Sequence, residues 1–357
     1  MQRRAIVIGG GVGGLTTAVA LRAAGWNVEV HERASGPPDT GSSLGLWPGA
    51  LRALDGLGLA DSTRRAARPA AYGTFVRADG TRIGDVDMAA LQRRSGDRVH
   101  VVARPVLLRA LTDALDEGIV RYGSRITDVQ HLDHDVVIAA DGLRSRARTA
   151  LFGDAHGPRY SGVTAWHGTV GFDTDGMTET WGRRARFGVI PRAGGLTHWF
   201  ACAPAAELEP SPGGELAALQ GWFGDWHPGV RRVLDHLAEA GEAAIGRNDL
   251  YDLSTPLPHY TSGRIALIGD AAHAMTPDLG RGACEAIVDG VTLARALTTH
   301  ADVQDALTVY DTIRRRPTQR LARAARLMNR VVHTPRRVTR VRDAAMKLFL
   351  AVGRPPA

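Results

Sequence analysis

Three glycines near the N-terminus have the spacing of a phosphate-binding turn. Gly9, Gly11 and Gly14 follow a short apolar run and precede a segment rich in alanine and leucine. This order predicts a strand, a tight turn and a helix whose first amide groups bind a pyrophosphate. Glu32 ends the next apolar segment, where a carboxylate can accept hydrogen bonds from the ribose hydroxyls of an adenosine. The pattern predicts a dinucleotide site, and by itself it fits NAD as well as FAD.

The composition is that of a large α/β protein with a basic charge balance. The chain has 357 residues, 42 glycines and a net charge of +7, which comes almost wholly from arginine because Lys347 is the only lysine. A basic field favours anionic cofactors and substrates and does not by itself indicate nucleic acid. We therefore expect no nucleic-acid partner, and a non-catalytic nucleic-acid-binding protein is a remote alternative.

The cysteines do not form a framework. Cys202 and Cys284 are the only two, and neither lies in a cluster with metal-ligand spacing. We therefore expect no disulfide framework, no metal site and a reducing, cytoplasmic environment. No stretch approaches the ~18 apolar residues of a membrane span, so we expect no such segment. Monomer and homodimer are both compatible with the sequence.

The elements that would hold the glycine turn come from separated parts of the chain. A buried-strand pattern returns before Asp141-Gly142 and again before Gly269-Asp270. Residues 161–203 instead show longer alternating strands with turns between them, which predicts a mostly antiparallel sheet. Local expectations are a loop that carries Gly45 and Trp47, a hairpin at 74–87 predicted by alternation around Asp79-Gly80, short strands at 118–122 and 125–130, and a C-terminal helix at 336–352.

Three segments together resemble one enzyme family. They are the glycine turn with Glu32-Arg33, the run Ile-Ala-Ala-Asp-Gly at 138–142, and the run R-I-A-L-I-G-D-A-A-H-A-M-T-P-D-L-G-R-G at 264–282. The combination resembles the single-component FAD-dependent aromatic hydroxylases, the para-hydroxybenzoate hydroxylase-like family. Trp47-Pro48, residues 159–166 and residues 276–284 are most similar to its urate hydroxylase and zeaxanthin epoxidase branch.

The resemblance implies an α/β fold in which a Rossmann-like FAD-binding domain is discontinuous and carries an inserted, mostly antiparallel substrate domain. We expect the FAD-binding domain at 1–70, 99–158 and 261–300, a substrate-domain hairpin at 71–98, the rest of the substrate domain at 159–260, and C-terminal helices at 301–357.

By position, the resemblance also implies the FAD contacts. Arg104 would reach the phosphates, Asp270 would hold the ribityl chain, and the helix start after Gly280 would face the flavin pyrimidine edge. A helix N-cap is the alternative role for Asp270. The full expected set is Gly9, Gly11, Val12, Gly13, Gly14, Glu32, Arg33, Gly45, Arg104, Ile126, Asp270, Gly280, Arg281, Gly282, Ala283 and Cys284.

The chain departs from the family pattern at three positions. Arg281 stands where relatives usually have glutamine, which predicts a cation near the flavin; the alternative is a side chain turned to solvent or to Asp278. Val288 stands where relatives commonly have glutamate. Leu196 lies about where urate-hydroxylating relatives carry an arginine, which argues against urate as the substrate.

The implied activity is that of a monooxygenase. In the family, NADH or NADPH reduces the non-covalently bound FAD, O₂ adds at flavin C4a, and the resulting hydroperoxide hydroxylates an electron-rich aromatic or heteroaromatic small molecule. Epoxidation, or a reductase or dehydrogenase activity on the same fold, are the alternatives. Trp47, His198 and Pro277 are the candidate substrate-pocket residues, and Trp166, His167 and Trp199 are further side chains that could face the flavin.

Overall fold

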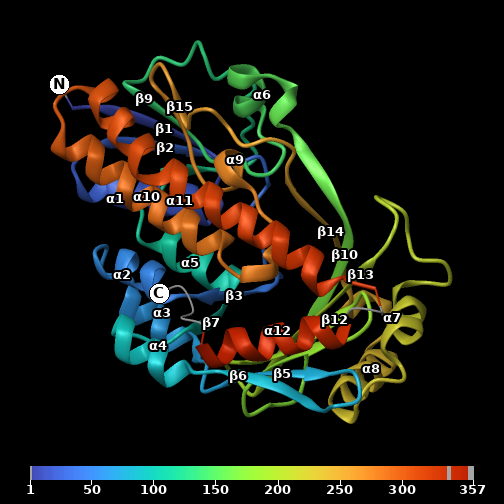
Figure 1. Cartoon of the computed structure of the whole chain (residues 1–357). Helices are drawn as coiled ribbons and strands as arrows, with labels where there is room; N and C mark the ends of the chain where they lie inside the picture. Colours follow the sequence, from blue (N-terminus) through green and yellow to red (C-terminus); the bar gives the residue numbers. More distant parts are fainter. Residues whose placement is uncertain (1, 336–338, 353–357) are drawn as a thin grey trace.

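A computed structural model describes residues 2–335 and 339–352 of the chain. Two large sheets organise it, with helices packed on them (Figure 1). The chain passes back and forth between the sheets, so that neither sheet is built from a single stretch of sequence. The predicted α/β fold class is confirmed.

The first sheet is parallel apart from one edge strand. β1 pairs in parallel with β2 and β9, β16 pairs in parallel with β9, and β15 is antiparallel to β16. Its order is β15-β16-β9-β1-β2-β8. The strands are β1 (Arg4–Ile8), β2 (Asn27–His31), β8 (Val120–Arg121), β9 (Val136–Ala139), β15 (Thr261–Ser262) and β16 (Ile265–Leu267).

Two helices cross closely beside this sheet, α1 (Val12–Ala23) and α10 (Gly282–Thr299). Glycine makes the approach possible. A Cβ at Gly290 would lie 2.7 Å from the Thr17 hydroxyl oxygen, and one at Gly13 would lie 3.2 Å from the Ala286 Cβ. The crossing holds the two helix N-termini in a fixed relation to each other.

The second sheet is mostly antiparallel and has the order β14-β10-β13-β12-β11-β5-β6. Only the β11–β5 pair is parallel. The hairpin β5–β6 confirms the strands predicted around Asp79-Gly80. The strands are β5 (Gly73–Arg77), β6 (Arg82–Val86), β10 (Pro158–Val170), β11 (Met177–Trp181), β12 (Arg186–Arg192), β13 (Leu196–Pro204) and β14 (Gly246–Leu253).

The two faces of the second sheet have different neighbours. One face packs on α7 (Glu215–Phe223) and α8 (Pro228–Ala240) and buries Trp166 and Trp199 there. These two tryptophans therefore do not face the cofactor domain, and that expectation is wrong. Because side chains alternate along a strand, His167 and His198 lie on the other face.

A three-stranded sheet and further helices complete the fold. The long helix α11 runs across the front of the first sheet, and α12 lies against β6 (Figure 1). The elements are β3 (Ser43–Leu46), β4 (Arg68–Pro69), β7 (His100–Ala103), α2 (Pro48–Asp55), α3 (Ala60–Ala66), α4 (Met88–Ser95), α5 (Arg104–Asp113), α6 (Arg146–Phe152), α9 (Asp270–His273), α11 (Val303–Val332) and α12 (Thr339–Val352), with short 3₁₀ turns η1 (Asp154–His156), η2 (Glu242–Ala244) and η3 (Pro277–Leu279).

Three local expectations need correction. Gly45 lies in strand β3, paired with Val101, rather than in a loop, because its neighbours complete a small antiparallel sheet. Residues 125–130 form no strand, since only β8 pairs with β2 at this edge. The first three residues of the helix expected at 336–352 lie outside the described residues. Among the described helices, none combines the length and apolar character needed to cross a membrane.

Candidate functional site

The glycine turn fits a pyrophosphate. Gly9 has φ +112°, and a Cβ there would lie 2.3 Å from the Ala140 carbonyl oxygen. A Cβ at Gly14 would lie 2.0 Å from the Gly9 carbonyl oxygen, whereas one at Gly11 would meet nothing within 4 Å. Helix α1 begins after Gly11 without a side-chain cap, so its first amide groups face open space. The turn is tight on its inner side and open where a phosphate would approach.

Glu32 lies directly beside this turn. Its Oε2 accepts a hydrogen bond from the Gly10 amide at 2.7 Å, and its Oε1 accepts one from the Ala34 amide at 2.8 Å. A carboxylate oriented in this way is available to ribose hydroxyls at the end of β2. Arg33 is exposed, and Ile126 is half-buried on the neighbouring segment.

Asp270 and Arg104 come from different parts of the chain and interact electrostatically. Desolvation raises the pKa of the Asp270 carboxyl group, and the charges of His273, Arg104 and Arg148 oppose that shift. The N-cap of α9 is Gly269 and no side chain caps this helix, so the alternative role of Asp270 as an N-cap is wrong. The carboxylate makes no hydrogen bond within the described part of the chain.

Arg148 fixes the turn that carries Asp270, and the sequence interpretation missed it. Its buried guanidinium donates hydrogen bonds to the carbonyl oxygens of Asp270 at 3.3 Å and Ala271 at 3.1 Å. The arginine-rich run that follows Asp141-Gly142 was the available signal, but nothing in it distinguishes the buried arginine from its exposed neighbours.

The N-terminus of α10 meets β3 and Trp47. The Cys284 thiol donates a hydrogen bond to the Gly45 carbonyl oxygen at 3.2 Å, and the Trp47 amide donates one to the Cys284 sulfur at 3.4 Å. Burial raises the pKa of the Cys284 thiol to about 11, so it stays protonated and can donate. Gly280 has φ +59°, and Gly282 and Ala283 open the helix without a side-chain cap. Five of the expected FAD contacts and Trp47, an expected substrate-pocket residue, are thereby brought together.

Arg281 turns back along α10. Its Nη2 lies 3.1 Å from a Glu285 carboxylate oxygen, and its guanidinium carbon lies 5.2 Å from the centre of the Trp47 ring. The side chain is mostly covered, so the solvent-facing alternative is wrong. Asp278 is not its partner either, because the Asp278 carboxylate pairs with Arg186 at 3.1 Å.

That Arg186–Asp278 pair joins the η3 loop to the second sheet. Asp278 lies in η3 next to Pro277, and Arg186 lies in β12 of the second sheet. The amide nitrogen of Asn329 in α11 donates hydrogen bonds to both Asp278 oxygens, at 3.1 and 3.3 Å. Because both charged side chains are almost fully buried, the η3 loop is held firmly against this face of the sheet.

His198 lies on the same face of the second sheet as Arg186. Burial, reinforced by His167 and Arg192, lowers the pKa of His198 to about 4, so it is neutral near pH 7. Its Nδ1 is buried without a hydrogen-bond partner in the described chain. Arg192 donates to the Thr169 hydroxyl at 2.8 Å next to it. This polar patch supplies uncharged and cationic donors on a sheet surface.

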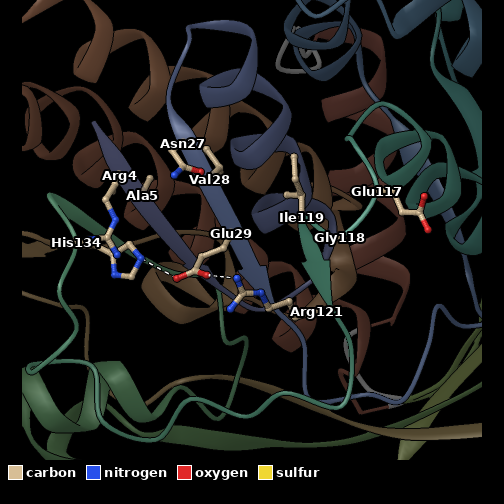
Figure 2. A pocket seen from close by; sticks show the side chains of 10 residues that line it. All are labelled: Arg4, Ala5, Asn27, Val28, Glu29, Glu117, Gly118, Ile119, Arg121 and His134. Carbon is tan, nitrogen blue, oxygen red and sulfur yellow. Dashed lines mark ion pairs between the residues drawn. The ribbon is translucent and has the colours of Figure 1, made fainter. Parts of the chain in front are cut away.

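A separate pocket of about 470 Å³ lies elsewhere, at the amino ends of β1 and β2 (Figure 2). Glu29 lies at its centre and pairs with His134 at 2.7 Å and Arg121 at 2.8 Å. Nucleotides bind at the carboxyl ends of parallel strands, where the glycine turn and Glu32 are found. The Glu29 pocket therefore lies at the amino ends of the strands, opposite the end where a nucleotide would bind.

Comparison with known proteins identifies the family. A family model described as "FAD binding domain" matches residues 2–136 and 245–325. The chain belongs to this FAD-binding family. The two matched parts contain the glycine turn, Glu32, Asp270 and the start of α10, and the unmatched part between them contains most of the second sheet.

Relatives in this FAD-binding family are named as monooxygenases. The chain is 32% identical to aurachin C monooxygenase/isomerase of Stigmatella aurantiaca, over 87% of this chain and 84% of the relative. It is 34% identical to 3-amino-4-hydroxybenzoate 2-monooxygenase of Streptomyces cremeus, over 93% of this chain and 88% of that relative. The crystal structure of Klebsiella pneumoniae HpxO complexed with FAD and uric acid superposes with a TM-score of 0.89 at 27% identity, covering 97% of this chain and 93% of that one. The chain is an FAD-dependent monooxygenase.

Proposed function

We propose that this monooxygenase consumes NADH or NADPH and hydroxylates an electron-rich aromatic or heteroaromatic small molecule between the start of α10 and the second sheet. The observation that carries the proposal is the Arg186–Asp278 contact, which holds the η3 loop, and with it Pro277, against the sheet face that bears His198. Bound FAD, once reduced, supplies O₂ activation and the transfer of one oxygen atom.

The protein's own contribution is binding and positioning. Backbone amides at the starts of α1 and α10 bind and stabilise negative charge on the cofactor, and Asp270 and Arg104 orient it between them. Trp47, Pro277 and His198 line the substrate side. His198 is neutral near pH 7, so it orients a polar substrate group by hydrogen bonding rather than by charge.

The substrate differs from urate in this proposal. Leu196 is directly opposite Arg192 in the β12–β13 pair, so the cation available on this part of the sheet comes from β12. A guanidinium there suits a substrate with an anionic or hydrogen-bond-accepting group. The two relatives named above act on an aurachin and on an aminohydroxybenzoate, and both classes belong in the substrate screen.

We also propose a cytoplasmic setting. Cys202 and Cys284 are both free and buried, which supports a reducing cytoplasm. A monomer or a homodimer is the proposed functional unit.

A substrate screen with labelled oxygen tests the proposal. Purified holoenzyme is mixed with NADH or NADPH and with phenols, aminohydroxybenzoates, aurachins, purine-like heteroaromatics or polyketide-type aromatics. We expect an accepted substrate to accelerate NAD(P)H oxidation and to gain one ¹⁸O atom from ¹⁸O₂. An ¹⁸O-labelled epoxide would identify an epoxidase. Rapid NAD(P)H oxidation without ¹⁸O in any product would instead indicate a reductase or dehydrogenase.

A further inference from the structure

A chain of alternating charges runs from the N-terminus of α10 into the interior. Arg281 pairs with Glu285 at 3.1 Å, and Glu285 pairs through its other oxygen with Arg314 of α11 at 2.6 Å. Arg314 then pairs with Asp289 at 2.6 Å, and Asp289 pairs with His273 at 2.6 Å. Two guanidinium groups and two carboxylates thus balance each other, and the chain ends on an imidazole.

Little water reaches this row of charges. The side chains of Arg281, Glu285 and Arg314 are 12%, 10% and 9% exposed, and that of Asp289 is 0% exposed. Charges that are shielded from water act on one another, and on a nearby ligand, more strongly than surface charges do. The Trp47 ring and Glu285 together also restrict the positions open to the Arg281 guanidinium. Its charge therefore has a fixed place beside the first amides of α10.

We propose that Glu285 is a positioning residue that sets the reduction potential of the flavin. It holds the Arg281 guanidinium at the start of α10 and offsets part of its charge. The inference rests on the proposed function, in which the start of α10 faces the cofactor. Reduction adds negative charge to the flavin, so Arg281 favours the reduced form and Glu285 opposes it. A glutamine at position 285 is neutral, so it no longer offsets the charge of the two arginines, and its single side-chain oxygen can accept a hydrogen bond from one of them in place of the two separate carboxylate oxygens.

Reduction potentials of three holoenzyme variants test the proposal. We expect Glu285→Gln to bind reduced FAD at least tenfold more tightly relative to oxidised FAD than the wild type does, which raises the two-electron potential by ~30 mV. Arg281→Gln should shift this ratio in the opposite direction. The double variant Arg281→Gln/Glu285→Gln should return close to the wild-type potential, because it removes one charge of each sign. A spectroscopic redox titration measures all three.

The control removes an arginine from a comparable i,i+4 pair at a different place. Arg315 pairs with Asp311 at 3.0 Å on α11, and Arg315→Gln should leave the potential unchanged. Suppose that Arg281→Gln lowers the potential, whereas Glu285→Gln lowers it or leaves it unchanged. This result would overturn the role of Glu285 but not the placement of the flavin at α10. Unchanged potentials in all variants would overturn that role together with the placement of the flavin at α10. If Glu285→Gln does not fold, the double variant decides. A tenfold or larger change in its ratio of affinities for reduced and oxidised FAD, which is a shift of ~30 mV or more from the wild type, would overturn the proposal.

Discussion

The two ends of the proposed cofactor site are built by different means. The glycine-turn end, Gly9 to Gly14 with Glu32, is made almost entirely of backbone, and a single carboxylate completes it. The α10 end, Gly280 to Cys284, depends on a row of buried charges supplied by α10, α11 and α9. Backbone amides keep their partial charge whatever side chains surround them, whereas a buried carboxylate needs its partners. Substitutions at the first end should therefore be harmful when they add atoms to the turn, and substitutions at the second end when they remove a charge.

The largest effect is expected from Asp289 at the α10 end. Its buried carboxylate accepts hydrogen bonds from His273 and Arg314, both at 2.6 Å, and from the Gly269 amide at 2.9 Å. Burial alone raises the pKa of Asp289, but His273 and Arg314 outweigh it and lower that pKa to about 2. Asp289→Asn should lower the free energy of unfolding by ~3 kcal/mol, because it leaves buried cations without their partner.

Urea unfolding of the protein at pH 7 measures this loss. The sign of the pH dependence follows from the pKa, which is lower in the folded than in the unfolded state. The stabilisation is fully present above about pH 4 and is lost as the pH falls towards 2. If the free energy of unfolding of Asp289→Asn lies within 1 kcal/mol of that of the wild type, the contrast between the two ends is not real.

A matched pair of alanine substitutions tests the glycine-turn end. Gly14→Ala places a methyl group 2.0 Å from the Gly9 carbonyl oxygen, so the unfolding free energy should fall by ~2 kcal/mol. Gly11→Ala meets nothing within 4 Å, so the unfolding free energy of the apoprotein should stay within ~0.5 kcal/mol of the wild type. Its FAD affinity should nevertheless fall, because the methyl group enters the space left for a phosphate.

Urea unfolding of the apoproteins and FAD titration by fluorescence separate these two outcomes. Equal stability losses in Gly11→Ala and Gly14→Ala would show that the turn is generally fragile. The shape argument would then not apply to either glycine.

The smallest effect is expected from Asp270, which lies between the two ends. Asp270→Asn replaces a charged acceptor by a neutral one, so the FAD dissociation constant should rise about fivefold, or ~1 kcal/mol. The stability of the apoprotein should hardly change, since the carboxylate makes no hydrogen bond within the described residues. Equilibrium titration of apoprotein with FAD measures the change. FAD affinity equal to the wild type would take Asp270 out of the cofactor site.

The sequence was most informative where a structure depends on neighbouring residues. Glycine spacing predicted the turn of Gly9 to Gly14, and alternation predicted the hairpin around Asp79-Gly80. The alternation of apolar and polar residues along a strand does not say which face of the second sheet meets the cofactor domain. The expectation that Trp166 and Trp199 face the flavin was wrong for this reason. That choice is made by α7 and α8, which cover one face.

Charged side chains were the least predictable part of the site. Asp278 is a possible partner of Arg281 by sequence, yet it pairs with Arg186 of the second sheet. Glu285 and Arg314 carried no signal in the sequence, because their pairing depends on how α10 packs against α11. Solvated and buried arginines cannot be told apart in a chain whose positive charge comes almost wholly from arginine.

The position of β16 has a consequence for synthesis on the ribosome. This strand completes the first sheet next to β9, but it is translated only after the whole second sheet. At ~5–20 residues per second, β9 waits on the order of ten seconds for its neighbour. Through that interval the nascent chain carries an unpaired strand edge, which is a site for aggregation. Since α10 (Gly282–Thr299) follows β16, the proposed cofactor site is complete only after α10 has been translated, and until β16 is added the edge of β9 stays open.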